Sequence, residues 1–255
     1  MKKNLLSVAG YDPTSGAGVS LDIKVFQLLG FQGVAILTSV TSQNTKHVKK
    51  VHCLPPEFLW DQYKTLREDI PFSGIKIGMV GCGKNIQTIQ KILATTPNIQ
   101  KVVDPVFKSS SGYWLLERES IPGYISGLKG KASLLIPNLE EASIISGIKI
   151  KNAEDMKKAA KSIYVLCGIP CFITGGYFSG KMVNLLYDGN NYKLFKREKI
   201  NKNVHGTGCF LSSSLLAYLS QGNPLEKACL LAIQLTHNAI KDAVQIGHGQ
   251  YIISF

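Results

Sequence analysis

The amino-acid sequence predicts an α/β protein of three layers (α/β/α), in which helices cover both faces of a mainly parallel central sheet. Strand-like apolar segments alternate with helical patterns from end to end, which is typical of parallel sheets. The 255 residues and 45% hydrophobic content suffice for one large core. No repeat, low-complexity stretch or linker divides the chain, so we expect a single domain over residues 1–255.

The expected elements alternate in order. Apolar runs bounded by turn residues predict strands at Leu5–Gly10, Val34–Ser39, Ile75–Ile77, Val102–Asp104, Leu134–Pro137 and Cys171–Thr174. Helical patterns between them predict helices at Gly18–Leu29, Pro56–Glu68, Asn85–Ala94, Leu139–Ser146 and Ala153–Cys167. Two later strands flank a Gly-Asn-Asn turn and predict a hairpin at the sheet edge, at Met182–Asp188 and Tyr192–Lys196. The chain then ends in two expected helices, at Cys209–Ser220 and Pro224–Val244.

Composition excludes several classes of partner. The net charge of +12 is unusual, but the lysines are dispersed, and only Lys46–Lys50 and Lys193–Lys202 are modestly dense. Because the lysines are dispersed and aromatic residues are not interleaved with them, we do not expect a nucleic-acid partner. An attraction for phosphorylated substrates explains the positive charge equally well. An apolar run of about 18 residues is missing, and Leu5–Gly10 is too short for a signal-peptide core. We therefore expect a cytoplasmic protein that does not associate with a membrane.

The cysteines form neither a metal-binding nor a disulfide pattern. They are scattered through apolar segments without a C-x-x-C pair, at Cys53, Cys82, Cys167, Cys171, Cys209 and Cys229. The five histidines do not cluster near them. We therefore expect neither a zinc site nor a disulfide framework.

The run His205-Gly206-Thr207-Gly208-Cys209-Phe210 joins a glycine turn to a largely apolar helix. Glycines let a ligand approach the main chain, and the free N–H groups of a helix start attract anions, so the run predicts a phosphate-binding turn. The same residues are compatible with a turn that merely begins a buried helix. Cys209 is either a base or nucleophile with a lowered pKa, or an inert packing residue.

The loop Ala9–Gly18 leads from the first predicted strand into the first predicted helix. This arrangement places ligands at the carboxyl ends of parallel strands. The loop matches neither G-x-G-x-x-G nor G-x-x-x-x-G-K-[ST], which disfavours dinucleotide and Walker-type sites. Asp22, one turn into the helix, either complements the helix dipole or faces the pocket and holds a polar substrate.

Two further strands end in polar residues. Asp104 follows Lys101-Val102-Val103, and Asn138 follows Leu134-Leu135-Ile136-Pro137, with Glu141 one helical turn later. Oxygen ligands of this kind can hold a hydrated Mg²⁺. Each residue alone is better explained as a helix cap or first-turn residue. Together with the glycine turn, however, they suggest a metal–nucleotide complex opposite an anion site.

In combination these motifs resemble the ribokinase superfamily, and within it the hydroxymethylpyrimidine and hydroxymethylpyrimidine-phosphate kinases of thiamine biosynthesis. The resemblance spans nearly the whole chain and rests on the shared order and spacing of Ala9–Gly18 with Asp22-Ile23-Lys24, Thr41–Thr45, Lys76–Met79, Asp104–Val106, Pro137–Ala142 and His205–Cys209. It implies a ribokinase-like fold. It also implies ATP- and Mg²⁺-dependent phosphorylation of 4-amino-5-hydroxymethyl-2-methylpyrimidine, and then of its monophosphate.

The resemblance also implies roles for individual residues. Gln43 is expected to bind the aminopyrimidine edge, because an amide offers a donor beside an acceptor. The other substrate contacts expected are Gly10, Asp22, Met79 and Val106. Mg²⁺ is expected at Asp104 and Glu141. ATP and its phosphates are expected at Asn138, Thr174, Gly176, Thr207 and Lys108.

Catalysis is expected at Gly206, Gly208 and Cys209. Main-chain N–H groups from Gly206 to Cys209 would neutralise charge on the transferring group. Cys209 stands where most of the superfamily carries an aspartate that takes the proton from the attacking hydroxyl. A thiolate could do the same, whereas a neutral thiol could only position the alcohol.

The chain departs from the family pattern in two places. It has Thr174-Gly175-Gly176 where these kinases usually carry a lysine before Gly-Gly, and Lys108-Ser109-Ser110-Ser111-Gly112 in place of Ala-Lys-Ser-Gly. The first change removes a charge from a phosphate site, for which Lys108 is a candidate replacement. Both changes bear more on the second phosphorylation than on the first.

Two other functions remain compatible with the sequence. Some close relatives of this branch phosphorylate vitamin B6 alcohols, so a pyridoxal or pyridoxine kinase is the nearest alternative. A non-catalytic pyrimidine-binding protein is the other. The resemblance further implies a homodimer, formed through sheet edges or adjacent helices.

Overall fold

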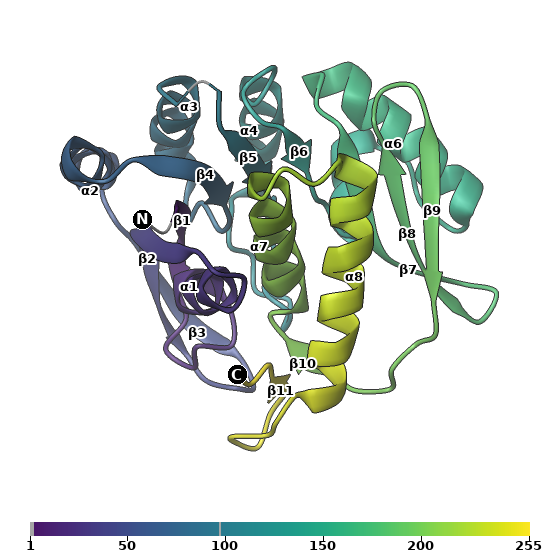
Figure 1. Ribbon diagram of the computed structural model, residues 1–255. Helices are drawn as coiled ribbons and strands as arrows, with labels where there is room; N and C mark the ends of the chain where they lie inside the picture. Colours follow the sequence, from purple (N-terminus) through teal and green to yellow (C-terminus); the bar gives the residue numbers. More distant parts are fainter. Residues whose placement is uncertain (1–2, 97) are drawn as a thin grey trace.

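A central sheet organises the computed structural model, which describes residues 3–96 and 98–255 (Figure 1). Its strands are β1 (Asn4–Tyr11), β2 (Gln32–Gln43), β3 (Val48–Cys53), β4 (Phe72–Ile77), β5 (Gln100–Val103), β6 (Leu134–Leu135), β7 (Cys171–Phe178), β8 (Lys181–Tyr187) and β9 (Tyr192–Arg197). They lie in the order β3-β2-β1-β4-β5-β6-β7-β8-β9. The pairs from β2 to β7 are parallel, while β3 and the β8–β9 hairpin add antiparallel pairs at the edges.

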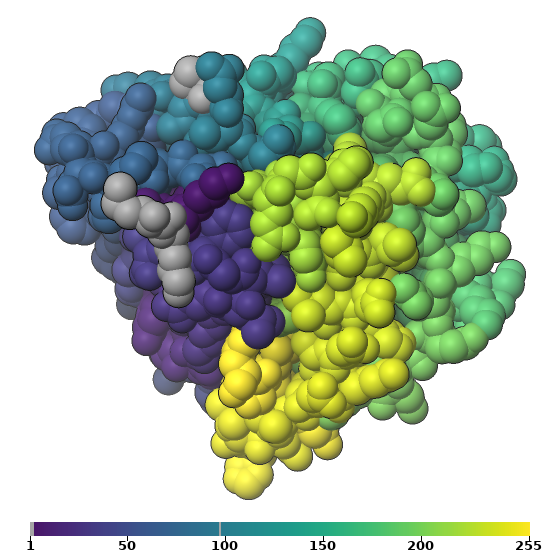
Figure 2. Space-filling model, in the orientation of Figure 1, coloured from purple at the N-terminus to yellow at the C-terminus, as the bar shows by residue number. Residues whose placement is uncertain are grey.

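Helices cover both faces of this sheet. They are α1 (Gly18–Leu28), α2 (Pro56–Asp69), α3 (Ile86–Ala94), α4 (Ile121–Gly127), α5 (Leu139–Ser146), α6 (Ala153–Cys167), α7 (Thr207–Ser220) and α8 (Leu225–Asp242), with short 3₁₀ turns at Gly83–Asn85 and Arg118–Ser120. One apolar cluster joins the sheet to α1, α7 and α8, and another joins it to α2, α3, α4 and α6. Figure 2 shows α7 and α8, in yellow-green and yellow, covering the near face beside the purple N-terminal segment. The predicted three-layer α/β architecture is confirmed.

The local sequence explains the most regular elements. Strand β1 is buried on both faces, so it reads as a continuous apolar run through Leu5, Leu6 and Val8. Helix α5 begins with a reciprocal capping box between Asn138 and Glu141. Helix α6 ends at Gly168, whose φ of 64° is a left-handed conformation that suits glycine. Both helices, α5 and α6, have the bounds that the sequence predicts.

Two elements were missed. Strand β3 was read as a lysine-dense segment, because an edge strand exposes residues such as Lys49 and Lys50 instead of burying an apolar run. Helix α4 carries Pro122 and Gly123 in its first turn and is only 7 residues long, so its helical pattern is weak. A further small sheet, β10 (Val204–His205) with β11 (Tyr251–Ile252), joins the chain ahead of α7 to the C-terminal segment.

A buried ion pair lies at the centre of the fold. Lys76 of β4 and Asp22 of α1 are both 0% exposed, and Lys76 Nζ lies 2.5 Å from Asp22 Oδ1. Ser213 of α7 donates to the same carboxylate at 2.7 Å, and Ser7 of β1 donates at 2.6 Å. Burial alone would lower the pKa of Lys76, but the Asp22 charge outweighs it and raises that pKa above its ordinary value. One carboxylate thus joins two strands of the sheet, β1 and β4, to two helices that cover the same face of it, α1 and α7.

A disulfide joins Cys53 and Cys82, with the remaining cysteines of the described segments free. The expectation of no disulfide framework was therefore wrong for this pair. The two residues are 29 positions apart, and their proximity arises only because β3 ends beside the loop that follows β4. Within the described residues, no helix combines the length and apolar character that crossing a bilayer requires.

We expect Asp22→Ala to lower the free energy of unfolding by about 3–5 kcal/mol, because it leaves the Lys76 charge buried without its partner. Urea denaturation measures this. The matched control is Lys64→Ala, which breaks the exposed Lys64–Asp61 pair and should cost at most about 1 kcal/mol. Equal effects of the two substitutions would contradict the importance assigned to the buried pair.

We expect Cys82→Ser to lower the free energy of unfolding by roughly 2–4 kcal/mol in non-reducing buffer, since the bond to Cys53 constrains the unfolded chain. In dithiothreitol the difference from the parent protein should largely vanish. Parallel urea titrations with and without reductant measure both. A difference that persists unchanged under reduction would show that the effect comes from packing and not from the bond.

Candidate active site

A cavity of about 510 Å³ opens at the carboxyl ends of the parallel strands. It is bounded by the loop after β1, the ends of β2 and β4, the loops after β5 and β6, and the start of α7. Most of the predicted site residues line it: Gly10, Gln43, Met79, Asp104, Val106, Lys108, Asn138, Glu141, Gly206, Thr207, Gly208 and Cys209. Residues from distant parts of the chain therefore meet in one place, at the sheet edge where this topology places ligands.

The glycine turn packs closely against the loop that follows β1. Gly206 has a φ of +79°, and a Cβ there would lie 1.8 Å from the carbonyl oxygen of Gly16. Only glycine can combine this conformation with this close approach. Helix α7 begins directly behind it at Thr207, and among the described residues no side chain caps its first N–H groups. These groups are left to face the cavity, as an anion site requires.

A second cavity of about 470 Å³ adjoins the first. The two share a wall formed by Asn138, Gly175, Val204, Thr207 and Gly208. Predicted residue Thr174 lines the second cavity, and so do three cations at the end of β9 and in the segment that follows it, Arg197, Lys199 and Lys202. The glycine turn thus stands between a substrate-sized cavity and a basic one.

Two buried carboxylates face the first cavity. Burial raises the pKa of Asp104, against the opposing effects of Lys76 and of a 2.9 Å hydrogen bond from Ser212. Burial, and after it the Asp104 charge, raises the pKa of Glu141 to about 8 despite its backbone hydrogen bonds. The described residues include no group of three or more metal-ligating side chains. Two carboxylates that a cation would stabilise nevertheless fit Mg²⁺, which takes one or two from the protein and its other ligands from phosphates and water.

The Cys209 thiol lies at the cavity wall. Cys209 is the third residue of α7 and directly follows Gly208. Burial raises its pKa to about 12, because the neighbouring Asp104 and Asp22 charges add to the desolvation and Lys76 only partly opposes them. The thiol is therefore neutral at physiological pH. This disfavours the thiolate form that would take a proton and leaves the alcohol-positioning alternative.

Two predicted residues lie elsewhere than expected. Asp22 is fully buried beneath the cavity and its carboxylate is occupied by Lys76, Ser7 and Ser213, so it supports the site without contacting a ligand. Gly176 is buried, and a side chain there would meet Phe178, Val183 and Met156; the exposed neighbour Gly175 faces both cavities instead.

Lys108 does not replace the missing lysine at Thr174. It lines the first cavity, whereas Thr174 lines the second, and its ammonium pairs with Glu140 and lies 4.4 Å from the centre of the Trp114 ring. The cations that share the second cavity with Thr174 are Arg197, Lys199 and Lys202.

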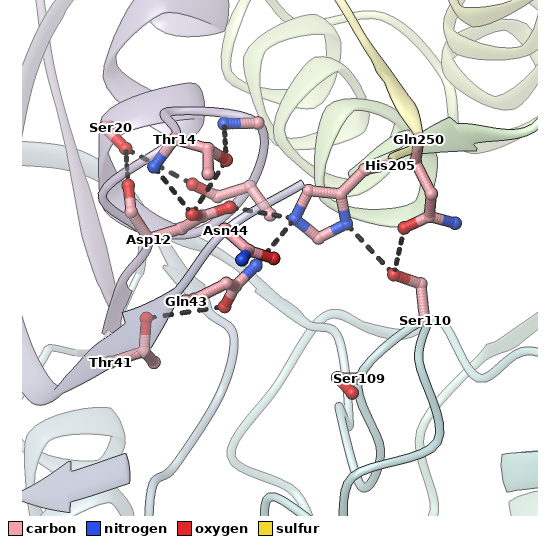
Figure 3. Close-up of polar contacts among 12 residues, drawn as sticks. Asp12, Thr14, Ser20, Thr41, Gln43, Asn44, Ser109, Ser110, His205 and Gln250 are labelled. Carbon is pink, nitrogen blue, oxygen red and sulfur yellow. Dashed lines mark hydrogen bonds and ion pairs between the residues drawn. The ribbon is translucent and has the colours of Figure 1, made fainter. Parts of the chain in front are cut away.

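Side chains at the mouth of the first cavity form a network that was not predicted (Figure 3). His205 Nε2 lies 2.8 Å from Asp12 Oδ2 and 3.2 Å from Gln43 Nε2. On the opposite side of the ring, His205 Nδ1 lies 3.1 Å from Ser110 Oγ. Burial alone would raise the pKa of Asp12, but hydrogen bonds from His205 and Thr14 outweigh it and lower that pKa. The carboxylate is therefore ionised and fixes the imidazole.

Some of the missed residues carry a signal in the sequence. Lys76 interrupts the apolar run Ile75-Lys76-Ile77, and a lysine in a buried parallel strand needs a partner. Likewise, Ser212, Ser213 and Ser214 form a polar triplet inside an otherwise apolar helix. Arg197 and Lys199 carry no such signal, because their position depends on where the edge strand β9 ends and on the path of the segment that follows it.

Comparison with known proteins gives consistent relationships. The family described as phosphomethylpyrimidine kinase matches residues 12–254. A hydroxymethylpyrimidine/phosphomethylpyrimidine kinase of Aquifex aeolicus is 37% identical over 252 residues, which cover 98% of this chain and 99% of the relative. The crystal structure of phosphomethylpyrimidine kinase from Clostridium difficile has a TM-score of 0.82 at 36% identity, covering 94% of this chain and 100% of that one. Pyridoxal kinase from Staphylococcus aureus in complex with ADP has a TM-score of 0.90 at 29% identity, covering 100% and 93%.

We expect the Cys209 thiol to stay un-ionised up to pH 9 in the folded protein, because its pKa is raised to about 12. The rate at which iodoacetamide alkylates the Cys209 peptide, followed by mass spectrometry, should rise about tenfold per pH unit from pH 7 to 9 without reaching a plateau. In urea the same peptide should ionise near the ordinary value of about 8.5. A plateau in the rate at pH 7–8 for the folded protein would show a thiolate and restore the base assignment.

Proposed function

The chain belongs to the phosphomethylpyrimidine kinase family, and we propose that it transfers a phosphoryl group from ATP to the hydroxymethyl oxygen of 4-amino-5-hydroxymethyl-2-methylpyrimidine. The same site would then phosphorylate the monophosphate to the pyrophosphate. These are the substrates implied by the relatives' names and by the residues that line the first cavity.

The observation that carries the proposal is the wall shared by the two cavities. A phosphoryl group can pass directly between two substrates only where their sites meet, with the reacting atoms about 3–3.5 Å apart. Here the sites meet at Thr207 and Gly208, where the first N–H groups of α7 provide positive charge for the transferring group. The basic second cavity would hold the nucleotide, and the first cavity the pyrimidine.

Asp104 and Glu141 would hold Mg²⁺ on the side of the shared wall that faces the first cavity. The metal would supply charge neutralisation for the phosphates when bound. Asn138 organises this corner in two ways. Its side chain accepts a hydrogen bond from the Glu141 N–H at 2.9 Å, and its own N–H donates to the Glu141 carboxylate at 2.8 Å. The Glu141 side chain is thereby held in position before any ligand binds.

Cys209 would orient the hydroxyl of the pyrimidine. A neutral thiol is a weak hydrogen-bonding group that cannot remove the proton at the start of the reaction. Phosphoryl transfer depends chiefly on alignment and charge stabilisation, so a site that aligns the alcohol without a strong base remains competent. Met79, 9% exposed and in contact with the end of β1 at Gly10, would form the apolar wall beside the ring.

A pyridoxal kinase is the second candidate, and the specific observation behind it is the structural overlap. The TM-score to the Staphylococcus aureus pyridoxal kinase exceeds that to the Clostridium difficile phosphomethylpyrimidine kinase, whereas the sequence identity runs the other way. Backbone overlap reports the scaffold, while the side chains that line the site determine the substrate. The sequence relationship therefore decides for the pyrimidine.

We expect the purified protein to phosphorylate the hydroxymethylpyrimidine with ATP and Mg²⁺, and pyridoxal at least tenfold less efficiently in kcat/KM. Parallel assays of each alcohol, with product identified by mass spectrometry, measure this. Removing Mg²⁺ with EDTA should abolish turnover of both alcohols. Preferential turnover of pyridoxal would reverse the assignment, and nucleotide binding without phosphorylation of either alcohol would favour the non-catalytic pyrimidine-binding alternative.

A further inference from the structure

A narrow flap, residues 108–114, lies at the mouth of the first cavity. Its ends are joined by an antiparallel bridge between Lys108 and Trp114, and its tip is closed by backbone hydrogen bonds from Ser109 to Tyr113 and from Gly112 to Ser109. Ser109 and Ser110 of the tip line the cavity. The flap is therefore placed to cover whatever the cavity holds.

The tip is attached to the body of the protein through one side chain. Ser110 Oγ lies 3.1 Å from His205 Nδ1 and 2.7 Å from Gln250 Oε1, on the opposite side of the mouth (Figure 3). The other side-chain hydrogen bonds of tip residues 109–112 in the described structure stay inside the flap, as between Ser109 and Ser111. A single hydroxyl thus determines whether the tip rests across the cavity.

One of the two partners of that hydroxyl, His205, is firmly anchored. The His205 side chain is 12% exposed and that of Asp12 is 6% exposed, at a separation of 2.8 Å. Asp12 is held in turn by the N–H of Thr14 at 2.9 Å and by its hydroxyl at 2.8 Å. The contact of Nε2 with Asp12 fixes the orientation of the ring, so that Nδ1 faces the flap.

The same imidazole also contacts the predicted pyrimidine-binding amide. Gln43 Nε2 lies 3.2 Å from His205 Nε2, and Thr41 Oγ1 lies 3.3 Å from Gln43 Oε1. His205 therefore stands between Gln43 at the substrate position and Ser110 at the flap. Because it immediately precedes Gly206, it is also continuous with the turn proposed to bind the transferring phosphoryl group.

We propose that His205 is a positioning residue that latches the flap over the pyrimidine cavity through Ser110, with Asp12 as its anchor. This inference rests on the proposed function, since it assigns the cavity to the acceptor alcohol. With the latch engaged, the flap excludes water from the acceptor cavity, and the alcohol is the nucleophile that reaches the phosphate. With the latch broken, the acceptor binds more weakly and water competes with it for the phosphoryl group.

The decisive variant is Ser110→Ala, which removes the hydroxyl from an exposed tip and should not affect folding. We expect KM for the pyrimidine to rise about threefold to tenfold, the size expected from one lost hydrogen bond, with KM for ATP unchanged. ADP should form in excess over phosphorylated pyrimidine, whereas the parent enzyme should give a ratio of one. Ser110→Thr keeps a hydroxyl and should restore both values.

Two further variants complete the test. Ser111→Ala, one residue along the same tip, has no role in the latch and should keep the parent KM and product ratio. His205→Asn should change KM and the product ratio in the same direction as Ser110→Ala but by less, because the bond from Ser110 to Gln250 remains, with circular dichroism to verify folding. Parent values of KM and product ratio in Ser110→Ala would overturn the latch.

A measurement that does not depend on turnover separates this inference from the proposed function. Hydrogen exchange of the peptide that contains residues 108–114 should be faster in Ser110→Ala than in the parent protein and in Ser111→Ala. If the parent protein failed to phosphorylate the pyrimidine, the proposed function would fall, while this exchange comparison would still decide whether the latch exists. Equal exchange in all three proteins would refute it.

Discussion

The geometry of the site depends on one buried ion pair, between Lys76 and Asp22. Charges this deep in a protein need partners, and the Asp22 carboxylate is satisfied by donors from three other elements: Lys76 of β4, Ser7 of β1 and Ser213 of α7. Each of these elements also contributes to the cavity, because β1 ends at the Gly10 turn, β4 leads to Met79 and α7 begins at the glycine turn. The pair therefore sets the relative positions of parts of the site that are far apart in the sequence, without itself touching a ligand.

The same pair explains the electrostatic character of the cavity. Lys76 is a positive group that Asp104 and Cys209 share in their surroundings, and its ammonium is paired directly with Asp22. Burial, and after it the charges of neighbouring carboxylates, raise the pKa of Asp104, of Glu141 and of the nearby Cys209 thiol. The acceptor side of the site is thus short of positive charge, while the adjoining cavity carries Arg197, Lys199 and Lys202. This asymmetry suits a reaction in which a cation and a polyphosphate enter together from the basic side.

The sequence was most informative where capping and turn residues mark the ends of elements. Helices α5 and α6 were predicted to the residue because Asn caps begin them and glycines end them. The carboxyl ends of the parallel strands were predictable for the same reason, so Gly10, Asp104 and Asn138 were placed around one cavity in advance.

Whether a given side chain faces that cavity was harder to predict. Asp22 was expected to contact substrate because the family resemblance assigns its position to the pyrimidine pocket, but the serine and lysine partners that draw its carboxylate inward come from three other segments. Strand β3, the disulfide and the basic wall all depend on edge strands and loops, where apolar periodicity carries little information.

The glycine turn that separates the two cavities has a stereochemical consequence. Since Thr207 and Gly208 border both sites, donor and acceptor can be held on opposite sides of the same phosphorus atom. The neutral Cys209 thiol at this junction is a poor nucleophile, which leaves little reason for a phosphorylated enzyme to form. A single in-line displacement follows, and it inverts the configuration at phosphorus. With an ATP donor that is chiral at the transferred phosphorus atom, the product would therefore have the inverted configuration, as a single direct transfer between the two cavities requires.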